Sequence, residues 1–266
     1  MLNIFYEHII EAATQSEITV EEALERFRAL GLEGLENPCW RLSARGETKR
    51  LFESAGFKVD SVYEFFDFPH DTEAESLRKI DVCLETAAFF GAGKILAVPG
   101  FNADSEQMKK LCGLMNTLCE RARKYGITVT VEDFDDEGSP CSTIAGLEYL
   151  LKNVGELKIT FDTGNFAYYL ESAEDAYTRL KSRVAHVHLK DRSRDISWFN
   201  GENGKSDLSG EMMYPCEVGG GYIGIGELIK RLLADGYSGS FSVEHFGAAD
   251  QLEYARKSVE YIKRFI

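Results

Sequence analysis

The 266-residue sequence lacks several patterns that mark common classes of protein. None of its six cysteines belongs to a Cys-x-x-Cys pair, which argues against a zinc knot or disulfide framework and favours reduced, mostly buried thiols. A membrane-spanning helix needs an apolar run of about 18 residues, and the sequence contains no run of that length. The first residues have neither the basic start nor the long apolar core of a signal peptide. We therefore expect a cytoplasmic protein that does not bind a membrane.

Positive charge is also scarce. The sequence holds 30 Lys and Arg residues against 44 Asp and Glu residues, which gives a formal net charge of −14. A surface with this charge repels nucleic acid and anionic lipid, so the expected partner is a small molecule. The composition, 44% hydrophobic and 28% charged, is otherwise that of an ordinary globular domain.

A helix, a glycine and a short strand recur in that order along the chain. Glycine is favoured just after a helix because the residue there usually has a left-handed backbone. The helices are predicted at residues 19–30, 43–55, 72–90, 105–125, 142–154, 225–235 and 252–265. The strands are predicted at residues 2–5, 32–35, 57–68, 94–99, 127–132, 157–162, 184–189 and 238–244.

Eight strands alternating with helices in a chain of this length predict a closed α/β barrel, the (β/α)8 TIM barrel, as one domain over residues 1–266. No Gly-x-Gly-x-x-Gly follows an early strand, which argues against a dinucleotide-binding fold. The connection 191–224 is predicted to be irregular and to cover the carboxyl face of the barrel, and such long connections are usually functional. Its glycines 219–221 could cradle a phosphate or serve as a hinge.

Four strands in succession end on residues that bind metals. Glu132, Asp162, His188 and Glu244 should meet, because the carboxyl ends of barrel strands converge on one face. Taken singly, each has an ordinary explanation as a cap, a salt-bridge partner or a core histidine. Together they form an oxygen-rich set that suits one divalent cation, with Mn²⁺ as the first choice and Mg²⁺, Co²⁺ or Zn²⁺ as alternatives. We predict a metal site at the C-terminal face of the strands.

Other polar residues surround this predicted site. His186 points to the same side as His188 but one layer deeper, so we expect it to contact the substrate or the ligands, or to pack in the core. Lys190 and Arg194 are candidates for holding substrate hydroxyls or a phosphate, although Lys190 also fits a solvated charge at the loop edge. His245 should point away from the barrel axis. Five aromatic residues either wall the pocket or belong to the core: Tyr6, Tyr63, Phe65, Phe66 and Phe68.

Segments at these strand ends resemble the xylose-isomerase-like barrel superfamily, and more narrowly its sugar phosphate isomerase/epimerase branch. That branch includes ketose 3-epimerases, hydroxypyruvate isomerases and inosose dehydratases. The segments are Val-Glu-Asp-Phe134, Phe-Asp-Thr-Gly-Asn165, Val-His-Leu-Lys-Asp191 and Ser-Val-Glu-His245. The resemblance implies that the four strand-end residues bind one divalent metal and that the substrate is a sugar or sugar phosphate. It also implies a substrate contact for Arg194, and it places Asn165 where ketose 3-epimerases have a histidine. Asparagine can donate a hydrogen bond to a sugar oxygen but cannot carry a proton.

The expected chemistry is proton transfer through a metal-bound enediolate, with Glu132 and Glu244 as the acid/base pair. Return of the proton to the opposite face gives an epimerase, and transfer between neighbouring carbons gives an aldose–ketose isomerase. Loss of a β-hydroxyl gives a dehydratase of an inosose-like keto sugar. An apurinic endonuclease relative and a non-catalytic sugar-binding barrel remain further alternatives. A homodimer or homotetramer is the expected assembly.

Overall fold

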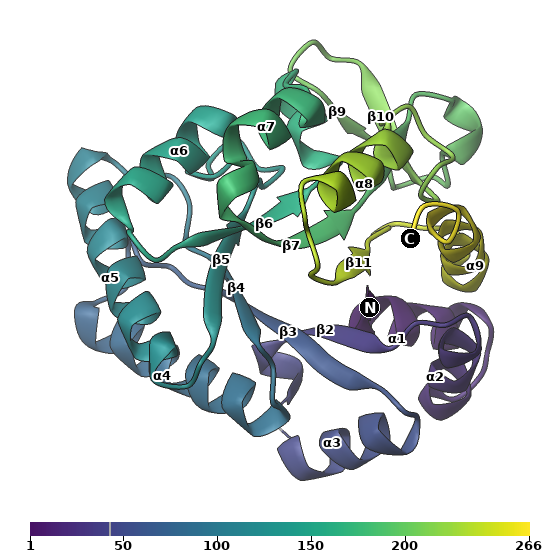
Figure 1. Ribbon diagram of the computed structural model, residues 1–266, viewed down its shortest axis with the longest axis horizontal. Coiled ribbons are helices and arrows are strands. Elements are labelled where there is room, and N and C mark those ends of the chain that lie inside the picture. The colour runs from purple at the N-terminus through teal and green to yellow at the C-terminus, as the bar shows by residue number, and fades with distance from the viewer. Residues whose placement is uncertain (43) are drawn as a thin grey trace.

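Eight parallel strands form a closed barrel in the computed structural model, which describes residues 1–42 and 44–266 (Figure 1). Around the barrel the strand order is β1-β11-β7-β6-β5-β4-β3-β2. Their bounds are β1 Leu2–Phe5, β2 Gly34–Pro38, β3 Lys58–Phe65, β4 Lys94–Val98, β5 Thr128–Glu132, β6 Lys158–Asp162, β7 Val184–Leu189 and β11 Phe241–Val243. All eight predicted strands are present, and the predicted fold class is confirmed.

Helices surround the barrel on its outside (Figure 1). Their bounds are α1 Tyr6–Gln15, α2 Val20–Ala29, α3 Arg45–Ser54, α4 Glu73–Phe90, α5 Ser105–Arg123, α6 Ile144–Asn153, α7 Ala173–Leu180, α8 Ile225–Ala234 and α9 Gln251–Ile262. The seven predicted helices agree with α2 to α6, α8 and α9 to within a few residues at each end. The predicted start at Ser43 lies outside the described residues.

Local chemistry explains where helices begin and end. Thr19 and Thr72 form capping boxes with Glu22 and Glu75, so each side chain accepts a backbone N–H at the start of α2 or α4. At the other end of α4, Gly91 has φ of 74°, a backbone conformation that glycine adopts without steric cost. The glycine after α4 is one of the signals from which the helices were predicted.

Two helices were not predicted. Helix α1 follows β1 directly, and its N-cap residue Phe5 makes no side-chain hydrogen bond to the helix. No polar cap or glycine therefore separates α1 from the strand. Helix α7 has 8 residues, too few for a clear apolar period, although Ser172 caps it.

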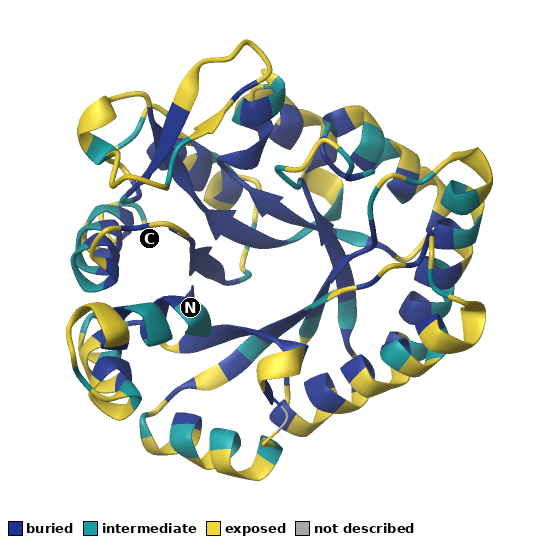
Figure 2. Ribbon diagram, turned by 180° about the vertical axis from the view of Figure 1, so that it is seen from behind, coloured by how far each residue is buried: buried dark blue, intermediate teal, exposed yellow. Residues whose placement is uncertain are grey.

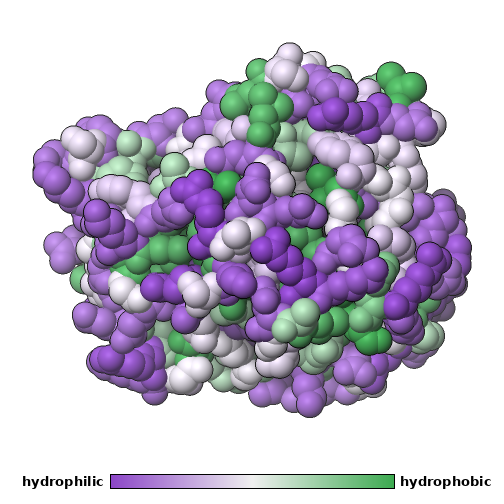
Figure 3. All heavy atoms as spheres, turned by 45° about the horizontal axis from the view of Figure 1, so that its top comes forward, coloured by the Kyte–Doolittle hydropathy of each residue, from purple (hydrophilic) through white to green (hydrophobic). Residues whose placement is uncertain are grey.

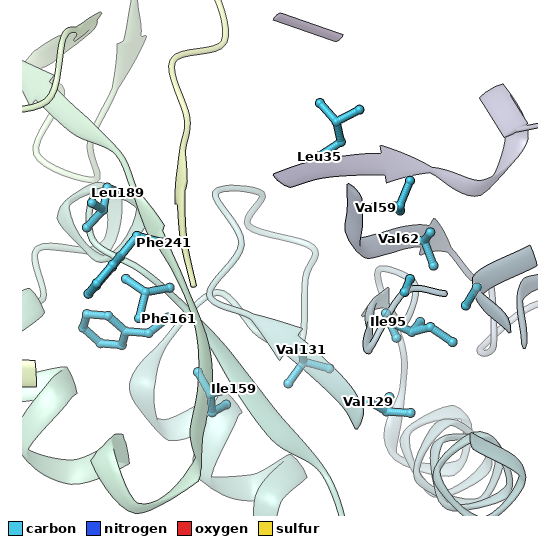
Figure 4. Close-up of a cluster of buried hydrophobic side chains, with 14 of the residues drawn as sticks. Leu35, Val59, Val62, Ile95, Val129, Val131, Ile159, Phe161, Leu189 and Phe241 are labelled. Atoms are coloured by element: carbon cyan, nitrogen blue, oxygen red, sulfur yellow. The ribbon is translucent and has the colours of Figure 1, made fainter. Parts of the chain in front are cut away.

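Strands β5 and β6 each have an apolar side and a polar side. In β5, Val129 and Val131 belong to the apolar cluster around the barrel, which Figure 4 shows together with Ile95 and Ile159. Thr130 points the other way, and its Oγ1 lies 2.7 Å from Oγ1 of Thr160 in β6. Because side chains alternate along a strand, the residues two positions after these threonines, Glu132 and Asp162, also face the interior of the barrel. The interior is therefore polar at the carboxyl ends of β5 and β6.

The connection after β7 is more regular than predicted. It contains a small antiparallel sheet in the order β8-β10-β9, with bounds Asp191–Ser193, Met212–Cys216 and Lys205–Ser206. The Asp191 carboxylate accepts the backbone N–H groups of Gly219, Gly221 and Ile223 at 2.9 to 3.2 Å. These glycine amides are therefore occupied by an internal anion, and the phosphate-cradle interpretation of 219–221 is wrong.

The surface is mostly polar. Figure 2 shows buried barrel strands and exposed outer faces of the helices, and Figure 3 shows one face that is largely hydrophilic, with hydrophobic side chains in several separate groups. All six cysteines are free and buried, as predicted. Among the described helices none is long and apolar enough to cross a bilayer.

Candidate active site

Four side chains from neighbouring strands meet at the carboxyl end of the barrel. They are Glu132 at the end of β5, Asp162 at the end of β6, His188 in β7 and Glu244 just after β11. Each offers one ligand atom, and these four atoms all lie within 4.8 Å of one another. Nδ1 of His188 is 2.5 Å from Oε1 of Glu132 and 3.1 Å from Oε2 of Glu244. The structure thus brings all four predicted ligands into one buried cluster, called the quartet below.

The donor atoms of the quartet fit a divalent cation. Oδ1 of Asp162 accepts the backbone N–H groups of Gly164 and Asn165 at 2.7 and 2.8 Å. Oδ2 of Asp162 is buried and has no hydrogen-bond partner among the described residues. A buried carboxylate oxygen without a partner costs free energy, which a bound cation would offset. The quartet also joins three carboxylates to one imidazole, a set that Mn²⁺, Mg²⁺ or Zn²⁺ can use.

A fifth residue, Glu36, supports His188 from the opposite side. Its Oε2 lies 3.1 Å from Nε2 of His188, so a proton on Nε2 is held there and Nδ1 keeps its lone pair for the quartet. The same oxygen accepts a hydrogen bond from Oγ of Ser242 at 3.0 Å. Sequence analysis missed Glu36 because it ended the second strand at Leu35, whereas β2 continues to Pro38. A carboxylate at the end of a strand was the signal that selected Glu132, Asp162 and Glu244, and Glu36 stands directly after the predicted end of the second strand.

His186 lies below the quartet and does not line the cavity. Its Nε2 is 3.0 Å from both Oε2 of Glu36 and Oγ of Ser242, and its Nδ1 is 3.2 Å from Oγ of Ser240. The side chain is fully buried. Its contacts are therefore with the groups that position Glu36, and the structure shows no route from His186 to a substrate.

The carboxylates of the quartet differ in their electrostatic environment. Burial raises the pKa of Glu132 to about 8, although His188 opposes the shift. Burial likewise raises the pKa of Asp162 to about 6, with Lys190 opposing the shift. Glu244 is equally buried, but Lys190 and His188 outweigh the desolvation and hold its pKa well below the usual range. Without a cation, Glu132 tends to hold a proton at neutral pH and Glu244 stays ionised.

A cavity of about 590 Å³ opens above the quartet. Glu132 and Glu244 form its floor, and aromatic side chains form part of its wall: Phe5, Trp40, Tyr63, Phe65, Phe134, Tyr168 and Phe246. Tyr63 and Phe65 therefore line the cavity, as one of the two interpretations predicted. Phe66 and Phe68 instead stack on each other in the core, with their ring centroids 4.6 Å apart. Tyr6 packs against Phe52, with 4.8 Å between the ring centroids.

Asn165 lines this cavity with its amide fixed in one orientation. Its Nδ2 donates to the backbone carbonyl of Asp133 at 2.7 Å, and a carbonyl can only accept. The side-chain oxygen of Asn165 is left without a partner among the described residues. Asn165 can therefore accept a hydrogen bond from a hydroxyl, whereas the sequence analysis expected it to donate one.

The two predicted basic residues lie in different places. Lys190 is 5% exposed, lines the cavity and places Nζ 2.6 Å from Oε1 of Glu244, so it is not a solvated loop charge. Arg194 has a side chain 45% exposed, pairs with Glu211 at 3.0 Å and lies outside the cavity. The cavity contains Arg192 instead. The alternation of His186, His188 and Lys190 continues to Arg192, and this period was the signal that would have found it.

His245 faces away from the quartet, as predicted. Its ring stacks on that of His8 with the centroids 4.9 Å apart, and both side chains are fully buried. These two histidines belong to the packing between α1 and the segment after β11.

Comparisons with known proteins agree with this geometry. The family model described as xylose isomerase-like TIM barrel matches residues 24–265. Inosose dehydratase 1 from Bacillus cereus (strain ZK / E33L) is 27% identical over 249 residues, which are 89% of this chain and 78% of that protein.

Two solved structures have similar folds. The probable 3-DHS dehydratase AsbF from Bacillus anthracis has a TM-score of 0.76 at 15% identity and covers 98% of both chains. The D-allulose 3-epimerase from Methylomonas sp. in complex with D-allulose has a TM-score of 0.76 at 14% identity, over 100% of this chain and 96% of that one. At these identities the likeness to both structures concerns the fold alone.

Proposed function

The chain belongs to the xylose isomerase-like TIM barrel family, and we propose that it is a divalent-metal-dependent sugar isomerase or epimerase. The observation that carries the proposal is the pair of buried glutamates, Glu132 and Glu244. They come from different strands, β5 and the segment after β11, and both contact His188 at the floor of one cavity. Two carboxylates with different proton affinities in a common pocket are suited to taking and returning a proton.

The quartet of Glu132, Asp162, His188 and Glu244 would hold the cation, for which Mn²⁺ is our first choice. When bound, a divalent cation polarises a carbonyl and the hydroxyl on the next carbon, and so acidifies the C–H bond of the carbon that carries this hydroxyl. Asn165 would accept a hydrogen bond from a substrate hydroxyl through its unpartnered oxygen. The aromatic wall excludes water from the apolar face of the sugar.

Lys190 gives the two glutamates different electrostatic environments. It contacts Glu244 and, among the described residues, makes no ion pair with Glu132. The positive charge of Lys190 favours ionised Glu244, which then removes a proton, while Glu132 delivers one. Delivery to the opposite face of the same carbon inverts that centre, and delivery to the neighbouring carbon exchanges carbonyl and hydroxyl positions.

A dehydratase is the second candidate. The observation that favours it is the inosose dehydratase that is 27% identical over 89% of this chain. The first step is the same, because Glu244 again removes a proton next to the carbonyl. The β-hydroxyl then leaves with a proton from an acid such as Glu132, which releases water and leaves a carbon–carbon double bond.

Exchange of carbon-bound hydrogen with D₂O tests the proposal and separates its branches. The Mn²⁺-loaded protein is incubated with free and phosphorylated ketoses and with an inosose, and the products are followed by NMR. Deuterium at carbon 3 identifies an epimerase, deuterium at carbon 1 an aldose–ketose isomerase, and new olefinic signals a dehydratase. A protein that binds the cation yet exchanges no hydrogen and releases no water from any of them would refute the proposal.

Two variants test the residues. Glu132→Gln and Glu244→Gln should each lower the exchange rate about 100-fold or more, because each removes a group that carries a proton. Glu227→Gln, on the exposed side of α8, makes the same chemical change outside the cavity and should leave the rate unchanged.

A further inference from the structure

Arg192 is a buried cation in the cavity that pairs with no carboxylate among the described residues. It lies on β8, is 4% exposed and lines the cavity above the quartet. Within residues 1–42 and 44–266 its guanidinium makes no ion pair with an acidic side chain within 4.0 Å, and its Nε has no hydrogen-bond partner. A buried charge normally has a partner, because an unpaired one loses its hydration without compensation.

The other basic side chains of the cavity already have partners. Nζ of Lys190 lies 2.6 Å from Glu244, and Nζ of Lys205 lies 3.3 Å from Asp135. Among the described basic residues that line the cavity, Arg192 is therefore the one without a carboxylate oxygen within 4.0 Å.

The surroundings of Arg192 hold it in place for binding. Its backbone N–H donates to Oδ1 of Asp191 at 2.8 Å, and its carbonyl accepts the N–H of Tyr222 at 2.9 Å. Its guanidinium lies over the ring of Tyr168, with Cζ 5.4 Å from the ring centroid. A planar guanidinium fixed in this way keeps its N–H groups ready for an oxyanion and loses little entropy on binding.

We infer that Arg192 binds a carboxylate of the substrate, so the substrate is a sugar acid or a hydroxy-keto acid rather than a neutral sugar. This inference rests on the proposed function, because it concerns the compound on which that site acts. A guanidinium binds a carboxylate through two parallel hydrogen bonds. The cavity is also lined by five acidic residues, which repel a phosphate dianion more strongly than a singly charged carboxylate. Arg192, Glu132 and Glu244 line the same cavity of about 590 Å³, which has room for a sugar-sized molecule that contacts all three.

Matched probes of equal size test the inference by calorimetry. D-gluconate and its neutral amide, D-gluconamide, are titrated into the Mn²⁺-loaded protein, alongside D-fructose 6-phosphate and D-fructose. The wild type should bind gluconate at least about tenfold more tightly than gluconamide, as expected for hydrogen bonds between charged groups. Arg192→Gln should abolish that preference while gluconamide binds as before. Arg179→Gln removes an exposed arginine of α7 that pairs with Glu148, and should retain the preference.

Three results would overturn the inference. The first is that Arg192→Gln weakens the binding of acid and amide equally, which is a structural effect. The second is that Arg192→Gln leaves the preference intact, which means that another group recognises the acid. The third result is dependence on Arg192 for fructose 6-phosphate but not for gluconate. If Arg192→Gln does not fold, Arg192→Lys decides, since it keeps the charge but loses the paired hydrogen bonds and should lower the preference about tenfold.

The two proposals fail separately. Binding of gluconate that depends on Arg192, without any hydrogen exchange or dehydration, refutes the chemistry and keeps the carboxylate site. Exchange on neutral ketoses, with no effect of Arg192 on gluconate binding, refutes the carboxylate site and keeps the chemistry.

Discussion

At the scale of single residues, the quartet depends on how His188 is oriented. An imidazole has two nitrogens, and it can bind a cation through Nδ1 only if the proton is on Nε2. Oε2 of Glu36 accepts a hydrogen bond from that N–H group, with 3.1 Å between Nε2 and Oε2, and Glu36 is itself fixed by His186 and Ser242. A buried carboxylate of this kind orients the ring and makes its free nitrogen more basic.

Replacement of Glu36 by glutamine should therefore weaken cation binding without touching a ligand. The affinity for Mn²⁺ is expected to fall roughly 10- to 100-fold, the usual effect of losing such a supporting carboxylate. Titration followed by electron paramagnetic resonance of free Mn²⁺ measures it. Glu33→Gln, an exposed glutamate three residues earlier, is the matched control. Equal affinities in the two variants would show that Glu36 does not support His188.

At this scale the sequence located ligands better than substrate contacts. The quartet could be found because each of its residues stands at the end of a predicted strand rich in β-branched or aromatic residues. Arg194 was chosen instead of Arg192 because the resemblance pointed to it. In the structure β8 keeps the alternation going after β7 ends, so Arg192 faces the cavity and Arg194 pairs with Glu211 near the surface.

At the scale of elements, the connection between β7 and α8 is organised by one side chain. The Asp191 carboxylate accepts four backbone N–H groups, from Arg192, Gly219, Gly221 and Ile223. A carboxylate that satisfies several buried amides holds the segments that carry them together. Asp191 thereby fixes Arg192 beside the cavity.

Substitution Asp191→Ala should loosen this connection. Amide hydrogen exchange over residues 217–224 is expected to accelerate about tenfold or more, because each lost hydrogen bond to a charged group is worth over ~1.4 kcal/mol. Mass spectrometry of exchanged peptides measures the rate, with Asp195→Ala, an exposed aspartate of the same connection, as control. Unchanged exchange in this segment would mean that the small sheet holds the connection without Asp191.

The sequence could not predict that sheet. Its strands β8, β9 and β10 have 3, 2 and 5 residues, which is too short for a visible alternation, and they pair across gaps of varied length. The long helices α4 and α5, by contrast, carry caps and repeated apolar positions, so they were predicted nearly to the residue.

At the scale of the whole molecule, closure of the barrel brings residues 112 positions apart, Glu132 and Glu244, to the same histidine. The fold could be predicted because helix, glycine and strand repeat along the chain. The register of the strand pairing could not be predicted, because it depends on how far neighbouring strands are shifted along each other. A shift between Leu35 and Glu36 in the pairing of β2 with β3 is one such irregularity, and it lies at the residue that was missed.

The buried acids should make the metal-free protein sensitive to pH. The pKa of Glu132 is raised to about 8 and that of Asp162 to about 6, so folding favours their protonated forms. Their contribution to stability is present at low pH and is lost as pH rises through these values. His186 and His245 have lowered pKa values and act in the opposite sense, but only below about pH 6.5.

The unfolding temperature of the metal-free protein is therefore expected to fall between pH 6.5 and 8.5. Saturating Mn²⁺ should reverse the trend, because the cation replaces those protons and binds more tightly as they leave. Scanning calorimetry with and without Mn²⁺ measures both. A metal-free protein whose stability rises over this range would contradict the assigned environment of Glu132.

The most direct test of the metal site is the stoichiometry and residue dependence of Mn²⁺ binding. Asp162→Asn removes the unpartnered oxygen but keeps the acceptor for the amides of Gly164 and Asn165. Asp135→Asn makes the same change in the same cavity, at a residue that pairs with Lys205 and does not belong to the quartet. We predict one Mn²⁺ per chain, retained in Asp135→Asn and weakened in Asp162→Asn by more than the roughly 10- to 100-fold expected for Glu36→Gln. No bound Mn²⁺, or equal affinity in the two variants, would contradict a metal site built from these four strand ends.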